Sequence, residues 1–435
     1  FSDMDYATGM PGTTGLSRCA SSFPHDGNTL ILDGGDILQG SPFAYWLSRN
    51  PVEGAKVSAR VMNLAGYQFV TIGNHDFNFG RETLESYLSH LDARCVSANV
   101  EGVAGVERIA VVTLENGLRV GITGVTTHFV NLWEKPENLE GIKVHEAFPA
   151  AAAALKELKK ANVDITVCIY HGGFENDLTT GELLSDTGEN QAYRICRELG
   201  GEVLLTGHQH IPIAPRKVLN TYVCQTGDKA KHFARMELTL EGGKLSMEGS
   251  LVSAGSTTNP EAAAILEPLD ARAAQWLDRP VGHLDVPLLP EDHIVMAEFG
   301  SGIANFFNQV QLAASGADIS CTSLGNEVKG FQQDITVRDV VATYIYPNTL
   351  QTLRVNRTVL KSALERSAQY FARRADGTLE VSQDFLKPKV EHYNYDYFAG
   401  IDVTMDIRNP VGSRVTAIRY QGTELPEDRW LTLCM

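Results

Sequence analysis

Four apolar runs in the first half of the chain each end in a glycine-containing loop with Asp, Asn or His at its tip. The runs and the loops that follow them are 30–32 with 33–36, 69–72 with 73–76, 165–170 with 171–173, and 203–205 with 206–210. Parallel strands present their carboxyl ends along one edge of a sheet, so side chains from distant loops meet there. Glycine lets the backbone turn sharply enough for these side chains to point into one cavity. The pattern therefore predicts an α/β domain with one polar site at a sheet edge.

The side chains at these tips are of the types that bind borderline divalent ions. Mixed oxygen and nitrogen donors suit Zn, Mn, Fe or Co, whereas an all-oxygen set would favour Mg or Ca. Each side chain also has an ordinary structural explanation. Asp36 could be an N-cap or turn residue, His171 could be hydrogen-bonded within a loop, and the pair His208 and His210 need not be ligands when considered alone. Independent structural causes would not place ligand types at four strand ends, so the combination favours a metal centre.

The composition limits the partners of such a site. The 435 residues include 37 Lys and Arg against 53 Asp and Glu, and the formal net charge is −16. Bulk charge therefore disfavours binding to a nucleic-acid polymer, and a single nucleotide would need a local positive charge such as a metal. Seven scattered cysteines without a C-x-x-C pair argue against a disulfide framework or a structural zinc. No apolar stretch approaches the roughly 18 residues of a bilayer-spanning helix. The oligomeric state stays open.

The organisation of the chain changes near Asn259. Before it, short β-branched runs alternate with helical patterns, which is typical of an α/β or α/β/β layered domain. The helical patterns cover 81–91, 150–161 and 191–199. Asn259 is a good N-cap and Pro260 suits the first helical position, so a helix is predicted there, with Pro268 bending or interrupting it. We predict an N-terminal domain over 1–255, a linking helix over 256–280 and a C-terminal domain over 281–435.

These loops resemble a known family. Four of them resemble, in order and spacing, the second to fifth motif blocks of the calcineurin-like metallophosphoesterases: Gly35-Asp36, Gly73-Asn74-His75-Asp76, His171, and Gly207-His208-Gln209-His210. The longer strings 33–42 and 73–80 resemble the 5′-nucleotidase family, nearest its 2′,3′-cyclic-nucleotide 2′-phosphodiesterase/3′-nucleotidase branch. The resemblance implies a four-layer α/β/β/α metallophosphoesterase domain, a linking helix and a smaller α+β nucleotide-binding domain. It also implies two-metal hydrolysis of nucleotide phosphoesters by an exported protein, periplasmic or on the cell surface.

The resemblance assigns the metal ligands. Asp36 would bridge two divalent ions, Mn, Zn, Co or Fe, with Asn74, His171 and His208 on one ion and His210 on the other. Two such ions can lower the pKa of a shared water and neutralise the entering and leaving oxygens of an in-line attack. The family's first block, an Asp-x-His that supplies two ligands to the second ion, has no counterpart here. We expect that the printed chain starts after that block and holds one ion weakly; the alternative is an incomplete site.

The resemblance also assigns a catalytic role to His75, which would stabilise charge in the transition state or protonate the leaving alkoxide. Relatives that cleave 5′-nucleotides have an Asp at the position of Asn78. The amide of Asn78 can hydrogen-bond the ring but cannot stabilise its cation as a carboxylate would. Together with the absence of the family's phosphate-binding Arg in the stretch 323–330, Asn78 favours cyclic phosphodiesters and 3′-monoesters.

The substrate would be a mononucleotide or a cyclic mononucleotide. Tyr346 takes the position of one of two aromatic rings that stack on the base; without the resemblance it would be a core aromatic. The second ring is expected beyond residue 435. The stretch 392–400 alternates aromatic residues, which predicts a strand, and the resemblance places Asn394 and Asp396 near the ribose. Two other functions stay open: a 5′-nucleotidase or nucleotide-sugar hydrolase, and a catalytically inactive nucleotide-binding relative.

Overall fold

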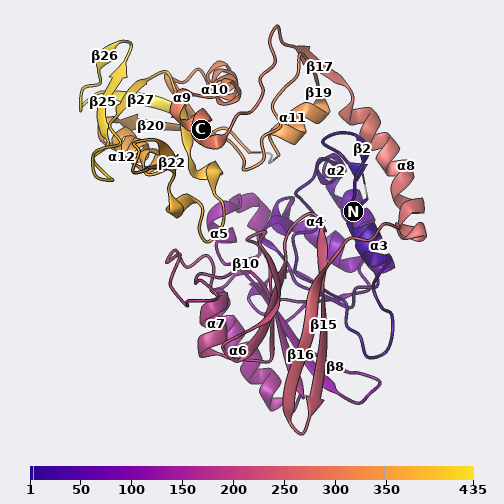
Figure 1. Ribbon diagram of the computed structural model, residues 1–435. Helices are drawn as coiled ribbons and strands as arrows, with labels where there is room; N and C mark the ends of the chain where they lie inside the picture. Colours follow the sequence, from indigo (N-terminus) through magenta and orange to yellow (C-terminus); the bar gives the residue numbers. More distant parts are fainter. Residues whose placement is uncertain (3, 346–347) are drawn as a thin grey trace. The chain divides into compact units, whose positions relative to one another are not determined.

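The computed structural model describes residues 1–2, 4–345 and 348–435. The chain divides into two compact units, Phe1–Gln275 and Trp276–Met435, and each is considered by itself. Figure 1 shows the chain coloured along the sequence, with some of the elements labelled. Helices and strands are mixed throughout both units, which confirms the predicted α/β class.

Two sheets form the middle of the first unit. Within the described residues, β3, β4, β5 and β7 make a four-stranded parallel sheet, and β13, β14, β12, β11, β9 and β8 make a mixed six-stranded sheet in that order. The strands of these sheets are β3 (Leu32–Asp33), β4 (Phe69–Val70), β5 (Arg94–Val96), β7 (Val106–Glu107), β8 (Ile109–Thr113), β9 (Arg119–Thr126), β11 (Ile165–His171), β12 (Val203–Thr206), β13 (Pro212–Val218) and β14 (Thr221–Thr226).

Smaller strand pairs complete this unit. They are β1 (Met4–Asp5) with β2 (Met10–Pro11), β6 (Val100–Glu101) with β10 (Lys143–Val144), and β15 (His232–Glu241) with β16 (Lys244–Ser253). The β15–β16 hairpin, which is labelled in Figure 1, packs against β13 and β14. Its residues alternate between half-buried and exposed along both strands, as expected of a two-stranded ribbon with one covered face.

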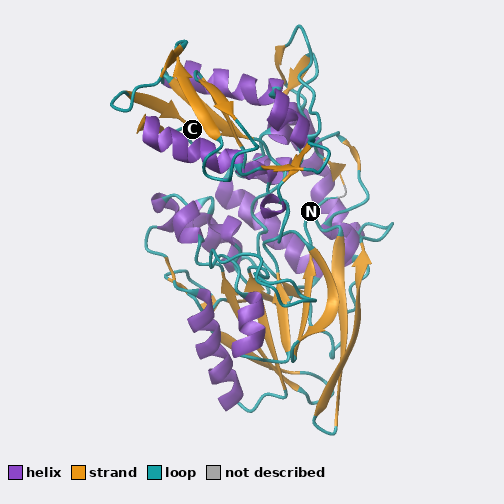
Figure 2. Cartoon of the chain, turned by 60° about the vertical axis from the view of Figure 1, so that its left-hand side comes forward, coloured by secondary structure: helices purple, strands orange, loops and turns teal. Residues whose placement is uncertain are grey.

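Helices cover the strands. The first unit contains α1 (Leu16–Ala20), α2 (Pro42–Leu47), α3 (Pro51–Ala65), η1 (Asn74–Phe77), α4 (Gly80–Ser89), α5 (Val130–Trp133), η2 (Pro136–Leu139), α6 (Ala147–Lys160) and α7 (Ala192–Glu198). The helices α4, α6 and α7 confirm the three helices predicted over 81–91, 150–161 and 191–199. Helices α6 and α7 pack on strands of the larger sheet (Figure 2), and α3 packs against α4. The predicted four-layer α/β/β/α arrangement is confirmed.

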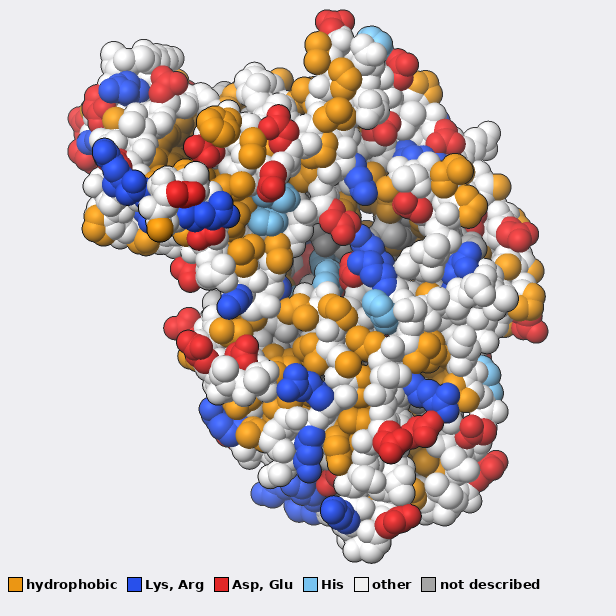
Figure 3. All heavy atoms as spheres, viewed as in Figure 1, with side chains coloured by type: hydrophobic (Ala, Val, Ile, Leu, Met, Phe, Trp, Pro, Cys, Tyr) orange, Lys and Arg blue, Asp and Glu red, His pale blue; other side chains and the backbone are white. Residues whose placement is uncertain are grey.

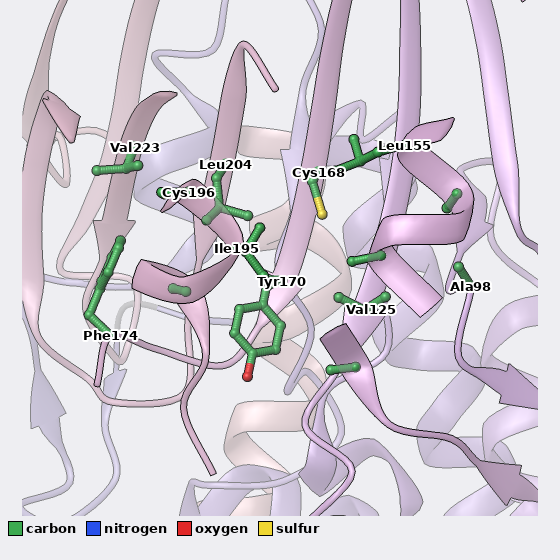
Figure 4. Close-up of a cluster of buried hydrophobic side chains, with 14 of the residues drawn as sticks. Ala98, Val125, Leu155, Cys168, Tyr170, Phe174, Ile195, Cys196, Leu204 and Val223 are labelled. Carbon is green, nitrogen blue, oxygen red and sulfur yellow. The ribbon is translucent and has the colours of Figure 1, made fainter. Parts of the chain in front are cut away.

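The two faces of β11 show how the larger sheet is held between layers. Val167 and Ile169 point into a core with Phe69 and Val96 of the smaller sheet. The alternate residues Cys168 and Tyr170 point into a second core formed with α6 and α7 (Figure 4). Because successive residues of a strand face opposite sides, a continuous apolar run such as 165–170 is what a strand covered on both faces requires.

The alanine-rich sequence of α6 suits its place against the sheet. Its buried positions are Ala147, Ala151, Ala154, Leu155 and Leu158, which share one face at helical spacing. Small side chains at these positions let the helix lie close to the strands. Lys159 and Lys160 in the last turn interact favourably with the helix dipole.

The sequence predicts that Pro268 bends or interrupts the linking helix, and the structure shows no interruption. Helix α8 (Pro260–Leu277) continues through Pro268 and across the boundary between Gln275 and Trp276. Ala262 and Leu266 before the proline and Ala273 and Leu277 after it are all buried. Burial of this stripe on both sides of Pro268 outweighs the one backbone hydrogen bond that proline removes.

In the second unit, the residues that the structure describes form a mixed four-stranded sheet in the order β20, β27, β18, β23, a three-stranded sheet in the order β24, β25, β26, and the pairs β17–β19 and β21–β22. The strands are β17 (Pro280–His283), β18 (Ile319–Ser323), β19 (Asp334–Thr336), β20 (Thr352–Asn356), β21 (Phe371–Arg373), β22 (Leu379–Val381), β23 (Asp396–Ala399), β24 (Asp402–Met405), β25 (Val415–Tyr420), β26 (Thr423–Glu424) and β27 (Trp430–Cys434). The helices are α9 (His293–Phe299), α10 (Gly302–Ser315), α11 (Val337–Thr343), α12 (Arg357–Ala368), η3 (Gln383–Phe385) and η4 (His392–Asn394).

The prediction of one strand over 392–400 is wrong for its first half. Residues His392–Asn394 form a 3₁₀ turn, η4, and only β23 pairs with β18. Local hydrogen bonds replace the strand ladder there: Asn326 Oδ1 accepts from the His392 N–H at 2.9 Å, and the Glu391 carbonyl accepts from the Asn394 N–H at 3.0 Å. The aromatic alternation in this stretch therefore does not mark one continuous strand.

The cysteines are buried, and the surface carries charges of both signs. All seven cysteines lie in the described part of the chain, and each is buried and free. On the face shown in Figure 3, acidic and basic side chains are interspersed. None of the helices in residues 1–2, 4–345 and 348–435 has the length and apolar character needed to cross a bilayer.

The core between β12 and the helices gives a stability prediction. Leu204 is 1% exposed in this core, so Leu204→Ala should leave a cavity and lower the free energy of unfolding by about 2–5 kcal/mol. Leu183, which is 58% exposed in the same unit, is the control. Leu183→Ala should change the free energy of unfolding by less than about 0.5 kcal/mol. Urea denaturation followed by far-UV circular dichroism measures both. Equal effects of the two substitutions would contradict the assignment of this core.

Candidate active site

The four predicted loops leave strands whose pairings bring the loops together in pairs. Parallel β3 and β4 place loops 33–36 and 73–76 side by side, and parallel β11 and β12 do the same for His171 and loop 206–210. The Gly207 N–H donates to the Gly172 carbonyl at 3.1 Å, which ties the second pair together beyond the sheet. The two pairs are joined by contacts of the His171 ring with the first two loops.

Close backbone packing joins loops 33–36 and 73–76. Gly35 has φ +89°, and a Cβ atom there would lie 2.4 Å from the Gly73 nitrogen. A Cβ on Gly73 would lie 2.2 Å from Asp36 Oδ1. Neither contact is sterically possible, so both glycines are required for these loops to approach each other.

The buried carboxylate of Asp76 holds the same two loops. It accepts hydrogen bonds at 2.8–3.0 Å from the backbone N–H groups of Gly73, Asp36, Ile37 and Leu38. Burial and the nearby Asp36 raise the pKa of Asp76, while the hydrogen bonds from Gly73, Leu38 and Asp36 act in the opposite direction. Sequence reasoning missed this residue, although its position directly after His75 was a signal.

Three predicted ligands adopt a backbone conformation that is unusual for their residue type. Asp36, His208 and His210 have φ values of 65°, 67° and 60°. A left-handed conformation at a residue other than glycine costs of order 1–3 kcal/mol and persists only where the surroundings enforce it. Here the left-handed conformation positions these three side chains at the strand ends.

Four of the predicted ligand side chains converge. His171 Nε2 lies 3.0 Å from Asp36 Oδ2 and 3.1 Å from Asn74 Oδ1. His208 Nδ1 lies 2.9 Å from the same Asn74 oxygen. The side chain of His171 is 3% exposed and that of Asp36 is 16% exposed. Residues from four separate loops thus place two oxygens and two ring nitrogens together.

In His171 and His208, the ring nitrogen that lies away from the converging set is a hydrogen-bond donor. His171 Nδ1 donates to the Gly34 carbonyl at 2.6 Å, and His208 Nε2 donates to Glu189 Oε1 at 2.7 Å. A neutral imidazole that donates through one nitrogen has a lone pair on the other. Each close contact between the other ring nitrogen and an acceptor oxygen therefore requires a cation, either a proton on the ring or a metal ion. The donor set fits a borderline divalent ion, and the outer partners orient the ligands as in known metal sites.

The charges within the set agree with this requirement. Burial lowers the pKa of His171, but the Asp36 carboxylate outweighs burial and raises it to about 9. Burial raises the pKa of Asp36, and the His171 and His75 rings outweigh it, so that this pKa lies below its ordinary value. A proton on His171 thus takes the position that a metal ion would fill, and metal binding would release it.

The remaining predicted ligand, His210, lies two residues beyond His208 in the same loop, at an exposed position. Within the described part of the chain, no three or more His, Cys, Asp or Glu side chains form a metal site by themselves. The converging set therefore depends on the amide oxygen of Asn74.

The predicted catalytic residue, His75, lies beside this set. Its backbone N–H donates to Asp36 Oδ1 at 2.7 Å, and its ring Nδ1 contacts Asn78 Oδ1 at 2.8 Å. Asn78 Nδ2 in turn donates to Glu134 Oε2 at 2.5 Å. The structure thus connects His75 to a carboxylate through one amide.

The substrate residues predicted in the second unit are described in part. Tyr346 lies outside the described residues. Asn394 Nδ2 donates to Glu391 Oε2 at 2.8 Å in the turn η4. Asp396 begins β23, and burial raises its pKa to about 6. Asn394 and Asp396 are thus two residues apart, on a turn and on the strand that follows it.

Three further residues next to the converging set were not predicted from the sequence. Glu189 contacts His208 Nε2, and the Trp133 ring stacks on the His208 ring with centroids 5.4 Å apart. The amide of buried Gln209 bonds both the N–H and the carbonyl of Phe174, at 2.8 and 2.9 Å. Gln209 stands inside a recognised motif, but neither Glu189 nor Trp133 lies in a patterned segment.

The glycine packing gives a second prediction. Gly35→Ala should displace the Asp36 loop and lower hydrolytic activity at least about tenfold, because the added Cβ overlaps the Gly73 backbone. Gly34→Ala is the matched control, since a Cβ at Gly34 meets nothing within 4 Å. Activity on p-nitrophenyl phosphate and far-UV circular dichroism should be measured for both. Comparable activity of the two variants would show that the close approach is not required.

Comparisons with known proteins agree with the motifs and the fold. The calcineurin-like phosphoesterase family matches residues 15–212, and the 5′-nucleotidase C-terminal domain matches residues 280–435. A Staphylococcus aureus protein solved as a candidate 5′-nucleotidase in complex with α-ketoglutarate is 30% identical, with a TM-score of 0.88 over 98% of this chain and 85% of that chain.

Two relatives known by activity are more distant. A trifunctional nucleotide phosphoesterase protein from Bacillus subtilis is 24% identical over 93% of this chain and 32% of its own length. The chain thus spans about a third of that protein. A 2′,3′-cyclic-nucleotide 2′-phosphodiesterase/3′-nucleotidase from Haemophilus influenzae is 23% identical over 97% of this chain and 75% of its own length. The resemblance noted from the sequence is confirmed: the chain is a phosphoester hydrolase and belongs to the 5′-nucleotidase family of calcineurin-like phosphoesterases.

Proposed function

We propose that this chain hydrolyses mononucleotide phosphoesters and prefers 2′,3′-cyclic phosphodiesters and 3′-monoesters. The observation that supports hydrolysis is the convergence of Asp36 Oδ2, Asn74 Oδ1, His171 Nε2 and His208 Nδ1. The preference is supported by Asn78, which contacts His75 where relatives that cleave 5′-nucleotides have an Asp, and by the absence of an Arg from 323–330.

The four converging atoms would hold one divalent ion, and His210 would contribute to a second. When bound, such ions neutralise the charge of the phosphoryl oxygens and lower the pKa of water. They also supply the local positive charge that an acidic chain needs to bind an anionic nucleotide. The metal would be Mn, Zn, Co or Fe, in agreement with the mixed donors.

Hydrolysis adds a water oxygen to phosphorus, breaks one ester P–O bond and transfers a proton to the leaving ribose oxygen. The second proton of the water passes to the solvent. In a 2′,3′-cyclic substrate the first hydrolysis opens the ring to a monoester, and a second releases phosphate. His75 would give the proton to the leaving oxygen from its ring, which the backbone bond to Asp36 keeps beside the phosphate site.

The second unit would bind the nucleoside part of the substrate. Asn394 and Asp396 would approach the ribose, and Tyr346 would stack on the base, which gives affinity without selecting one base. Tyr395, which lies between Asn394 and Asp396 in sequence, belongs to an aromatic cluster with Tyr370, Phe371 and Phe385. Export of the protein stays a prediction from the family resemblance.

A substrate panel tests the proposed preference. Initial rates on 2′,3′-cyclic AMP, 3′-AMP and 5′-AMP should be measured with added Mn²⁺ or Co²⁺. We expect the first two to be cleaved at least about tenfold faster than 5′-AMP, as a site lacking the phosphate-binding Arg should discriminate by that order. A dominant rate on 5′-AMP would favour a 5′-nucleotidase instead. Nucleotide binding without any turnover would identify an inactive relative.

A substitution of Glu189, which contacts His208, tests the proposed metal site. Glu189→Gln removes the carboxylate that orients the ring, so Mn²⁺ affinity should fall about 10- to 100-fold. Glu182→Gln removes an exposed carboxylate that precedes Glu189 in sequence, and it should leave the Mn²⁺ affinity unchanged. Isothermal titration calorimetry of both variants measures the affinities. Unchanged affinity in Glu189→Gln would contradict the proposed role of the Glu189 carboxylate in orienting His208.

A further inference from the structure

A chain of hydrogen bonds runs from His75 through Asn78 to Glu134. His75 Nδ1 contacts Asn78 Oδ1 at 2.8 Å, and Asn78 Nδ2 donates to Glu134 Oε2 at 2.5 Å. All three side chains are half-buried. Glu134 directly follows α5, far from the loop of His75 in sequence, so the contact depends on the fold.

Other donors hold the Glu134 carboxylate in place. Its Oε1 accepts from the Lys135 N–H at 2.7 Å and from Asn138 Nδ2 at 2.8 Å. Asn138 Nδ2 also donates to the Asn78 carbonyl at 2.9 Å, and the Glu134 N–H donates to the Val130 carbonyl at 2.9 Å. The carboxylate is therefore fixed between donors on both oxygens.

This arrangement determines which way the Asn78 amide faces. An amide has a donor end and an acceptor end, whereas an ionised carboxylate only accepts. Glu134 therefore takes the NH₂ end of Asn78 and leaves Oδ1 for His75. Because Oδ1 only accepts, His75 Nδ1 must carry a proton, and a neutral ring then has its lone pair on Nε2.

We propose that Glu134 is a positioning residue that, through Asn78, keeps the proton of His75 on Nδ1. Nε2, which carries the lone pair, takes up a proton from the solvent and passes it to the leaving ribose oxygen as the P–O bond breaks. This inference rests on the proposed role of His75 in nucleotide hydrolysis. The negative charge that relatives place next to this histidine is present here one residue further away.

The substitution Glu134→Gln should reverse the amide. The introduced glutamine would turn its oxygen toward the two donors, Lys135 N–H and Asn138 Nδ2, and its NH₂ toward Asn78. Asn78 would then present Oδ1 to this new NH₂ group and Nδ2 to His75, which places the ring proton on Nε2. A neutral ring in that state is a far weaker acid at Nε2 than an imidazolium, and it loses the correct tautomer for catalysis.

A double substitution should restore the original state. In N78D/E134Q the NH₂ of the introduced glutamine donates to the new carboxylate, and the second oxygen of that carboxylate accepts from His75 Nδ1. The pair contains the same number of carboxylates and amides as the original. Recovery in the double variant would separate tautomer control from simple loss of charge or of packing.

Nuclear magnetic resonance gives a readout that does not depend on turnover. Long-range ¹⁵N–¹H spectra of the full chain with ¹⁵N-labelled histidine and bound Zn²⁺ distinguish the two tautomers, and H75Q assigns the signal. We expect Nδ1–H in the unmodified chain, Nε2–H in E134Q and Nδ1–H again in N78D/E134Q. A neutral His75 ring with its proton on Nε2 in the unmodified chain would overturn the proposal even if every variant failed to fold, and a neutral ring with its proton on Nδ1 in E134Q would also overturn it.

Kinetics supply the second readout. For 3′-AMP, whose leaving group needs a proton, E134Q should lower kcat by about 10- to 100-fold with KM within about twofold, and the double variant should recover most of this. For p-nitrophenyl phosphate, whose leaving group needs no proton, kcat should change by less than about threefold. Equal losses on both substrates would mean a structural role and would overturn the proposal.

The controls distinguish this inference from the proposed function. Glu137→Gln removes an exposed carboxylate from η2 and should leave both rates and the His75 signal unchanged. If the unmodified chain turned over no nucleotide, the proposed function would fail, while the spectra would still decide whether Glu134 sets the tautomer. If nucleotides were cleaved but E134Q retained Nδ1–H, only the role of Glu134 would fail.

Discussion

The buried carboxylate of Asp76 is the interaction on which the rest of the site depends. It gathers backbone N–H groups from loops 33–36 and 73–76 and from the residues just after Asp36. Buried donors without partners would cost free energy, and hydrogen bonds to a charged acceptor are stronger than those between neutral groups. One side chain thus accepts the hydrogen bonds of backbone N–H groups in two tight turns, which a regular strand ladder could not pair. The left-handed Asp36 and the close approach of Gly35 to Gly73 follow from this turn.

The order of the sheet explains why the converging side chains could be located from sequence. An apolar run buried on both faces and a glycine-rich polar loop are local signals, and parallel pairing then brings such loops to one edge without further information. Asn74, His171 and His208 therefore meet as predicted from their positions at strand ends. The helices α4, α6 and α7 were predictable for a similar reason, since each has one apolar face.

Other features depend on tertiary contacts that no local pattern encodes. Glu189 and Glu134 lie in segments without periodicity. The role of each depends on a tertiary contact, with the His208 ring or with the Asn78 amide. Helix α8 passes through Pro268 because side chains on both sides of the proline are buried, which a propensity argument cannot weigh. The aromatic alternation over 392–400 was misleading for the same reason: the Asn326 side chain and local turn bonds decide the conformation of η4.

Asn78 shows how an apparent loss at one position can be compensated elsewhere. Considered alone, an amide next to His75 lacks the charge that a carboxylate would provide, which argues against a role in proton transfer. In the fold, that amide is held at its other end by a carboxylate that is itself fixed by Lys135 and Asn138. An amide that cannot turn transmits a preference for one tautomer as firmly as a carboxylate does, but with less charge beside the ring. A site that must bind an anionic phosphate next to this histidine would gain from that difference, because a carboxylate in direct contact would repel the substrate.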